Sequence, residues 1–254
     1  MSKRIICVLL SVVCILCFSS CEDDSEVLIN KTRYVAVVSD SDETTAAKIY
    51  CDSIGGELSE YASSFDAVTA VRNGKADFVV LNEYEAQSFI DSKCELEFSE
   101  KCEYKLEYRA IFNFENKKLL NEFNEAIESL TNDGTFDKIK QSHIKGESFN
   151  VPDSSGEKGE LVMLCDPIFE NRVYYNDENV LMGTDVDIAK TICAYLGYDL
   201  VIEVADFDTM FLEIESGNAD FIMSSAEYTE QRAENFLFSN VYSTLEYNVY
   251  TRKE

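Results

Sequence analysis

The sequence predicts an α/β fold with two lobes of similar build, and three observations support this. Short apolar, β-branched segments alternate with helical patterns along the chain, which is typical of mixed, mainly parallel sheets. A helix closed by glycine and followed by Ala-Asp-Phe occurs twice, over 65–78 and 207–221. Residues 146–158 have the composition of a linker and separate the two halves.

The first half begins with a leader (1–20) and a polar tether (21–32). Capping residues, helical spacing of apolar residues and β-branched runs then define its elements. The expected elements are a strand at 34–39, helices at 44–54 and 65–73, a strand at 76–81, a helix at 83–92, an extended segment at 104–114 and a helical segment at 116–145 interrupted at 133–135.

The second half repeats the alternation after the linker. Strands are expected at 161–164, 200–204 and 220–223, and helices at 185–196 and 207–215, with a further helix opened by Thr229. The 104–114 segment places Tyr108, Ala110, Phe112 and Phe114 on one face, which predicts a half-buried strand.

The N-terminus has the pattern of a processed leader. Residues 5–18 are apolar apart from Ser11 and follow two basic residues, a length too short to span a bilayer but suited to a signal peptide. Two serines then precede Cys21, which resembles a bacterial lipobox whose cysteine is lipidated, although Phe18 departs from the leucine-like residue usual there. An ordinary secretory signal is the alternative. Both predict an extracytoplasmic protein.

Composition excludes several functions. The 254 residues include 48 Asp and Glu against 22 Lys and Arg, a net charge of −26 that phosphate backbones would repel, so no nucleic-acid partner is expected. The single histidine, His143, cannot build a multi-histidine zinc site, and it leaves little basis for a Ser-His-Asp triad. We expect no metal and no cofactor. Hydrophobic residues make up 46% of the chain, so the acidity belongs to a globular protein.

Five cysteines remain beyond the leader, at positions 51, 94, 102, 165 and 193, and their spacing does not suggest metal binding. An odd number cannot pair completely within one chain. Cys94 and Cys102 are close enough in sequence to bridge a hairpin, while Cys193 lies within a helical apolar pattern that predicts burial.

A dense series of short motifs occupies the second half. In order they are Asp166-Pro167, Met182 to Lys190, Leu196-Gly197, Asp206-Phe207-Asp208, Gly217 to Asp220, Ser224-Ser225, Thr229 to Arg232 and Phe238-Ser239. Their order and spacing resemble the first lobe of the bacterial extracellular solute-binding proteins that deliver polar amino acids to ABC importers. The first half resembles the family's second lobe, more diffusely, through its strand at 35–38, Asn73 to Asp77 and the ending at Asp133-Gly134-Thr135.

The resemblance implies a two-lobed, periplasmic-binding-protein-like (type II) fold with the ligand in a cleft between hinged lobes. It also implies a circularly permuted order, because the family's second lobe (33–107) and the returning strand and helices (108–145) precede its first lobe (159–254). The 146–158 linker would join the old ends. The rival interpretation is a fusion of half-domains, each completed by a partner chain.

The resemblance also assigns ligand-binding residues. Arg232 corresponds to the arginine that clamps the α-carboxylate, a task for which the guanidinium fork is suited. A surface ion pair with Glu230 or Glu234 is the alternative. Asp166, at the start of the motif series, is included among the ligand-binding residues.

Other assigned positions have structural alternatives. Ser224 and Ser225 correspond to small polar residues that offer hydroxyl and backbone groups to the solute, or they form an ordinary loop at a strand end. Phe169 corresponds to an aromatic residue stacked over the ligand and Phe207 to a pocket wall, although either could belong to the core. Thr229 contacts the ligand or caps a helix.

Three departures from the family bear on the ligand. Glu227 replaces a small residue, and Asn82 replaces an aspartate that grips the α-ammonium. Asp40-Ser41-Asp42 replaces a Gly-Thr-Thr-like turn whose helix N-terminus faces the carboxylate, so both Ser41 and Asp42 are expected at the ligand. A carboxylate here would repel the solute carboxylate unless Asp42 caps its helix and faces water. A cationic or cation-bearing ligand, met by Glu227 and Asp42, is therefore one hypothesis.

The resulting expectation is a monomeric, lipid-anchored protein that has no chemistry of its own. It would capture a small polar, amino-acid-like solute for an ABC permease on another chain. Two alternatives stay open: a dehydratase-like enzyme using cleft carboxylates, with Glu227 as the candidate acid or base, and a sensory protein that binds without transport.

Overall fold

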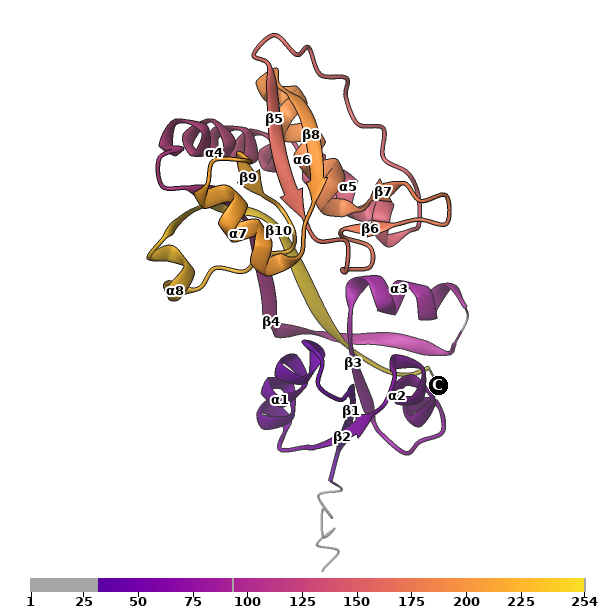
Figure 1. Ribbon diagram of the computed structural model, residues 1–254. Coiled ribbons are helices and arrows are strands. Elements are labelled where there is room, and N and C mark those ends of the chain that lie inside the picture. The colour runs from indigo at the N-terminus through magenta and orange to yellow at the C-terminus, as the bar shows by residue number, and fades with distance from the viewer. Residues whose placement is uncertain (1–31, 93, 254) are drawn as a thin grey trace, which may run out of the picture. The chain divides into compact units, whose positions relative to one another are not determined.

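A computed structural model describes residues 32–92 and 94–253. The leader, Cys21 and nearly all of the tether lie outside these residues. One eight-stranded sheet runs through the described chain in the order β2-β1-β3-β10-β4-β9-β5-β8. Helices α1–α3 accompany one end of this sheet and α4–α8 the other (Figure 1). The α/β class predicted from the alternation of strands and helices is confirmed.

We call the first group the N-lobe. Its elements are β1 (Tyr34–Val38), α1 (Glu43–Ile54), β2 (Glu57–Tyr61), α2 (Ser64–Arg72), β3 (Phe78–Asn82) and α3 (Glu83–Asp91). Strand β1 pairs in parallel with both β2 and β3. Side-chain caps begin two of the helices: Ser63 accepts from Asp66 N at the start of α2, and Asn82 caps α3.

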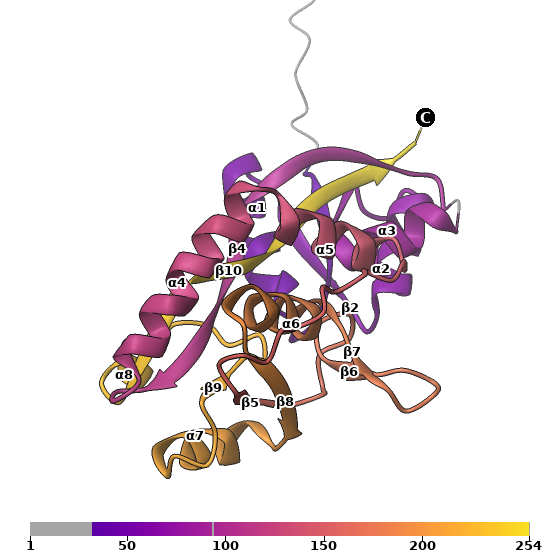
Figure 2. The same ribbon diagram turned by 90° about the horizontal axis from the view of Figure 1, so that it is seen from above.

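The second group, which we call the C-lobe, is assembled from two stretches of sequence. Its elements are α4 (Lys117–Asn132), α5 (Thr135–Ile144), β5 (Glu160–Cys165), β6 (Tyr174–Tyr175), β7 (Leu181–Met182), α6 (Thr184–Leu196), β8 (Asp199–Val204), α7 (Phe207–Glu215), β9 (Phe221–Ile222) and α8 (Glu230–Ala233). Helices α4 and α5 both pack on α6, and α4 also lies along β10 (Figure 2). Residues 117–144 therefore pack on the 159–254 segment of the same chain.

Two long strands join the lobes. Strand β4 (Leu96–Asn113) has 18 residues and β10 (Phe236–Arg252) has 17, and they pair antiparallel along most of their length. At one end β10 pairs with β3, and at the other β4 pairs with β9. Both strands belong to the N-lobe sheet at one end and to the C-lobe sheet at the other.

The structure differs from the sequence-based expectation in three respects. The alternation did not predict β2, the first part of β4 or β10, because these strands mix charged residues with aromatic ones and lack a continuous apolar run. The expected helix after Thr229 is a single turn, α8. The expected parallel pairing holds within each lobe, but the centre of the sheet is antiparallel because β4 and β10 run in opposite directions.

The expected buried face of the returning strand is largely correct. Tyr108, Ala110 and Phe112 are buried, whereas Phe114 lies beyond the end of β4 and is exposed. Phe112 packs against the fully buried rings of Phe123 from α4 and Phe221 from β9, with centroid distances of 5.0 and 5.9 Å. These contacts fasten the returning helix onto the C-lobe sheet.

The five cysteines at positions 51, 94, 102, 165 and 193 are all free. Burial raises the pKa of the Cys165 and Cys193 thiols to about 12, so both stay protonated at neutral pH. Cys193 is buried as its helical pattern predicts. Along the described residues, no helix combines the length and apolar character needed to cross a bilayer.

The start of α3 is fastened to the C-lobe by two polar contacts. The Tyr84 hydroxyl lies 2.9 Å from Thr184 Oγ1 in a buried position, and Thr184 Oγ1 donates to Asn171 O, so Tyr84 is the donor between them. Lys140 Nζ on α5 lies 2.7 Å from Glu83 Oε1, with both side chains largely buried. These contacts hold the two lobes together on one side of the long strands.

Replacing Tyr84 by phenylalanine is expected to lower the free energy of unfolding by about 1–2 kcal/mol, because it removes a buried hydrogen bond and little volume. Urea unfolding of the purified protein measures this value. The control is Tyr195→Phe, whose hydroxyl bonds to Ser129 at an exposed position. An equal loss in both variants would contradict a special role for the Tyr84 contact.

Candidate functional site

The candidate site lies where strand ends from both lobes approach the long strands. In the N-lobe, Ser41 and Asp42 follow β1, and Asn82 is the last residue of β3. In the C-lobe, Asp166 follows β5 and Ser224 follows β9. All four strands have the parallel orientation within their lobes, so these residues follow carboxyl ends, where α/β sheets place their ligands.

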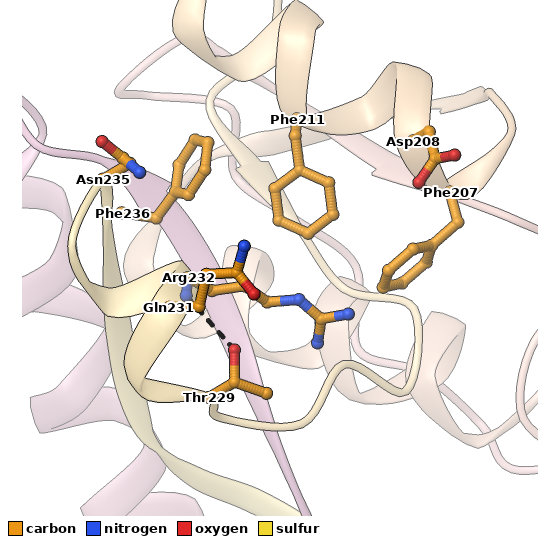
Figure 3. A pocket seen from close by; sticks show the side chains of 8 residues that line it. All are labelled: Phe207, Asp208, Phe211, Thr229, Gln231, Arg232, Asn235 and Phe236. Atoms are coloured by element: carbon orange, nitrogen blue, oxygen red, sulfur yellow. Dashed lines mark hydrogen bonds between the residues drawn. The ribbon is translucent and has the colours of Figure 1, made fainter.

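Arg232 borders a cavity in the C-lobe. Thr229 Oγ1 accepts from Arg232 N at 3.2 Å and caps the short helix α8, which fixes the backbone of the arginine. The half-buried guanidinium packs over the rings of Phe207 and Phe211, at 5.0 and 5.5 Å from their centroids (Figure 3).

The cavity has a volume of about 380 Å³ and is lined only by C-lobe residues and the start of β10. The residues around it are Phe207, Asp208, Phe211, Thr229, Gln231, Arg232, Asn235 and Phe236 (Figure 3). The one hydrogen bond described for the Arg232 guanidinium runs from Nη1 to Glu227 O at 3.0 Å. Most of its donors are therefore available to an anionic group beside the aromatic wall.

Ser224 and Ser225 are buried and bonded within the protein. Ser224 Oγ accepts from Asp166 N at 2.9 Å and lies 3.3 Å from Asp166 O, so it joins the ends of β5 and β9. Ser225 N and Oγ both donate to Asp185 Oδ2, at 2.7 and 3.1 Å. Binding of the solute by either hydroxyl stays a prediction. It would require the hydroxyl to replace its present hydrogen bonds within the protein by bonds to the solute.

Sequence reasoning missed the most buried charge pair. Arg172 is 3% exposed and its Nη2 pairs with the fully buried carboxylate of Asp185. Its Nε donates to Ser225 Oγ at 2.7 Å, and its guanidinium lies 4.1 Å from the centroid of the Tyr108 ring on β4. Tyr242 on β10 donates to Asp185 Oδ2 at 2.9 Å. The pair thus links the C-lobe to both long strands.

A glycine allows Arg172 to approach α6. Gly183 has φ 132°, and a Cβ built there would lie 2.1 Å from Arg172 O. Only glycine fits this approach, which brings the backbone of Arg172 against the start of α6, beside Asp185. The Gly183-Thr184-Asp185 sequence was noticed as part of the motif series, but nothing in the spacing identified Arg172 as its partner.

The N-lobe residues predicted at the ligand differ in their partners within the protein. Asn82 Oδ1 accepts from Tyr84 N and Glu85 N, and Asn82 Nδ2 donates to Glu43 Oε1 at 2.9 Å, so both ends of the amide have partners. Ser41 Oγ donates to Val38 O. Asp42 precedes α1 without a side-chain capping bond and is exposed.

The environments of Glu227 and Asp42 raise the pKa of both carboxyl groups. Desolvation, followed by the charge of Asp42, raises the pKa of Glu227, and Arg232 opposes this effect. Desolvation and the charge of Glu43 raise the pKa of Asp42. Glu227 also forms a β-bridge with Tyr108, which places it beside β4. Asp42 stands at the N-cap position of α1 without a side-chain capping bond, and its charge acts on Glu227.

Phe169 and His143 lie outside this arrangement. Phe169 forms a β-bridge with Val173 and is partly exposed, at the loop that carries Arg172. The ring of His143 on α5 contacts Asp187 Oδ2 on α6 at 2.8 Å, so it serves the packing of these helices. Among the described residues, no three His, Cys, Asp or Glu side chains form a metal-binding group.

Comparison with known proteins identifies part of the chain. The family described as bacterial extracellular solute-binding proteins, family 3, matches residues 161–254. The arginine-binding extracellular protein ArtP of Bacillus subtilis is 27% identical over 107 residues, which is 42% of this chain and 41% of that protein. Membrane-bound lytic murein transglycosylase F of Desulfosudis oleivorans is 29% identical over 99 residues, 38% of this chain and 21% of that protein.

This chain therefore spans about two fifths of the first relative and about a fifth of the second. Among solved structures, the match to an ancestral cationic amino acid solute-binding protein covers 89% of this chain and 83% of that protein's chain. The two are 12% identical, and the TM-score is 0.44.

Proposed function

We propose that this chain, whose residues 161–254 match the bacterial extracellular solute-binding proteins of family 3, captures a small polar, amino-acid-like solute outside the cytoplasm for an ABC importer. The solute binds reversibly and is not chemically changed. The permease is a separate chain. Cys21 carries the lipid that holds the protein at the membrane.

The half-buried guanidinium of Arg232 is the observation that carries this proposal. It is held in place by the Thr229 cap and two aromatic rings, and one hydrogen bond to Glu227 O is described for it. A planar fork fixed in this way suits two carboxylate oxygens, the group shared by amino-acid solutes. The ring packing restricts the side chain before binding, which reduces the entropy lost on capture.

A thermal-shift screen of the mature protein tests the binding function. The screen contains the common amino acids, polyamines and related amines, and a true solute raises the melting temperature in a concentration-dependent way. Failure of every compound to stabilise a protein shown by circular dichroism to be folded would overturn the proposal.

The permuted order is part of the proposal, supported by where the ends of the folded chain lie. Val35 of β1 and Thr251 of β10 both pair with Phe78 of β3, so the start of β1 and the end of β10 meet at one end of the sheet. Two strand spacings, about 10 Å, separate them. A connection of about four residues would span this gap.

A reordered chain tests the permutation directly. Residues 159–254 are placed first and joined through a short glycine-serine linker to residues 33–145. We expect a monomer whose melting temperature lies within a few degrees of the native order and whose solute preference is unchanged. A reordered chain that folds only as a dimer would favour the half-domain fusion.

One observation favours a second candidate, a dehydratase-like enzyme. Desolvation and the charge of Asp42 raise the pKa of Glu227, and a carboxyl group that keeps its proton to a higher pH is better suited to act as a general acid. Incubation of the protein with prephenate-like substrates, with the change in the absorbance of the substrate followed over time, would detect turnover. Activity that is lost in Glu227→Gln would replace the binding proposal.

A further inference from the structure

Ser225, in the turn after β9, has a backbone conformation that favours glycine. Its φ is +50°, in the left-handed region, where Cβ crowds the neighbouring carbonyl oxygen. Among the described residues other than glycine that have a positive φ, Ser225 is the only buried one. A conformation of this kind persists only where the surrounding structure holds it.

Asp185 and Arg172 provide this hold. Ser225 N and Ser225 Oγ both donate to Asp185 Oδ2, at 2.7 and 3.1 Å, and Arg172 Nε donates to Ser225 Oγ at 2.7 Å. Arg172 and Asp185 are also paired with each other and are both buried. The backbone and the side chain of Ser225 are therefore bonded to one buried ion pair, through hydrogen bonds strengthened by its charges.

The residues that follow Ser225 are fixed to β4. Arg109 N donates to Ala226 O at 3.0 Å, and Glu227 forms an antiparallel bridge with Tyr108. Ala226 is 1% exposed and belongs to an apolar cluster of the C-lobe. The turn is thus held on one side by the ion pair and on the other side by a long strand.

The turn leads to the carbonyl group that is bonded to Arg232. Arg232 Nη1 donates to Glu227 O at 3.0 Å, which is the one hydrogen bond described for this guanidinium. The Thr229 cap fixes the backbone of Arg232, and the guanidinium lies over two phenylalanine rings (Figure 3). Because Glu227 is two residues beyond Ser225, a change of φ at Ser225 would displace Glu227 O and release the guanidinium.

We propose that Arg172 and Asp185 are positioning residues for Arg232. They hold the left-handed turn at Ser225, the turn places Glu227 O, and this oxygen fixes the direction of the guanidinium fork beside the cavity. This inference rests on the proposed function, in which Arg232 binds the carboxylate of the solute. A fork that is oriented before the solute arrives loses less entropy on binding.

Two substitutions at Ser225 separate the backbone conformation from the hydroxyl group. Ser225→Gly removes the hydroxyl, but glycine adopts a positive φ without steric cost. Ser225→Thr keeps the hydroxyl, but its branched Cβ disfavours a positive φ. If the turn positions Arg232, the glycine variant keeps the orientation of the guanidinium and the threonine variant loses it. A role of the hydroxyl alone would give the reverse result.

The proton–nitrogen NMR spectrum of the Arg232 guanidinium reports its orientation without any solute. The signals are identified by their loss in Arg232→Lys. A guanidinium held by Glu227 O rotates slowly about its Nε–Cζ bond, so the wild type and Ser225→Gly should give separate Nη1 and Nη2 signals. Ser225→Thr should give one averaged signal.

Rescue by glycine tests the ion pair itself. In the double variant Arg172→Met with Asp185→Asn, the hold on Ser225 is weakened and averaged Arg232 signals are expected. Adding Ser225→Gly should restore the separate signals, because glycine needs no hold, whereas adding Ser225→Thr should not. If the pair served stability alone, glycine would restore nothing. Circular dichroism checks folding, and the two single variants at Ser225 decide the matter if the combined variants do not fold.

Separate Arg232 signals in Ser225→Thr, or averaged signals in the wild type, would overturn the positioning role. A folded combined variant that glycine does not rescue would also overturn it.

The thermal-shift screen with the common amino acids, repeated on the Ser225 variants, separates this role from the proposed function. A stabilising amino acid should keep its shift in Ser225→Gly and lose at least about half of it in Ser225→Thr. If no amino acid stabilises the folded wild type while the NMR signals respond as expected, the proposed function fails and the positioning of Arg232 stands. If an amino acid stabilises all variants equally and the signals do not respond, the positioning fails and the binding function stands.

Discussion

Arg172→Met is expected to lower the free energy of unfolding by about 3–5 kcal/mol, the cost of leaving a buried carboxylate without its cation. Asp185 is fully buried and accepts from Ser225 and Tyr242 in addition to Arg172. Neutral donors cannot replace the guanidinium charge in this setting. Methionine preserves the unbranched apolar stem, so the loss reports mainly on the charge.

Urea unfolding measures this loss, and a shifted midpoint with an unchanged slope identifies it as a change in stability. Arg72→Met on the exposed end of α2 is the control and should remain within about 0.5 kcal/mol of the wild type. In the double variant Arg172→Met with Asp185→Asn, the total loss should be smaller than the sum of the single losses, because neither charge is left alone. A loss below about 1 kcal/mol in Arg172→Met would contradict the interpretation.

Arg232→Ala is expected to weaken solute binding by about 10- to 100-fold, since a charged hydrogen bond contributes roughly 1.5–3 kcal/mol. The protein should remain folded, because the guanidinium is only half buried and its ring contacts lie beside a cavity. Titration with the solute identified by the thermal-shift screen measures the dissociation constant.

Arg232→Lys distinguishes charge from geometry. Lysine keeps the positive charge but lacks the planar fork, so we expect its affinity to fall between those of the alanine variant and the wild type. Arg72→Ala is the control and should bind as the wild type does. Equal affinity in the alanine variant and the wild type would show that the carboxylate of the solute is bound elsewhere.

Local patterns predicted most elements of the two lobes. Helical spacing and capping residues placed α1, α4 and α6 within a residue or two of their ends, and short apolar runs placed β1 and β5. These signals work because each element buries one face against its own lobe. The first part of β4 and the whole of β10 were not predicted, because these segments mix charged or polar residues with aromatic ones and lack a continuous apolar run.

The candidate site was predictable in part. The motif series identified Arg232, Thr229 and Phe207, and the structure gathers these three around one cavity. The acidic departures Asp42 and Glu227 were noticed at distant positions, and the structure brings their charges into interaction. Arg172 was not identified, because nothing in the local sequence pairs it with Asp185, 13 residues further along the chain.

The sequence by itself determined the α/β class and the strongly negative net charge, because these depend on local periodicity and on composition. The tertiary structure alone decided the pairing of Arg172 with Asp185, the contact of Tyr84 with Thr184 and the stacking of Tyr104 on Tyr247. Each of these joins residues far apart in the chain, and their energies depend on burial and on distances that only the packed lobes establish.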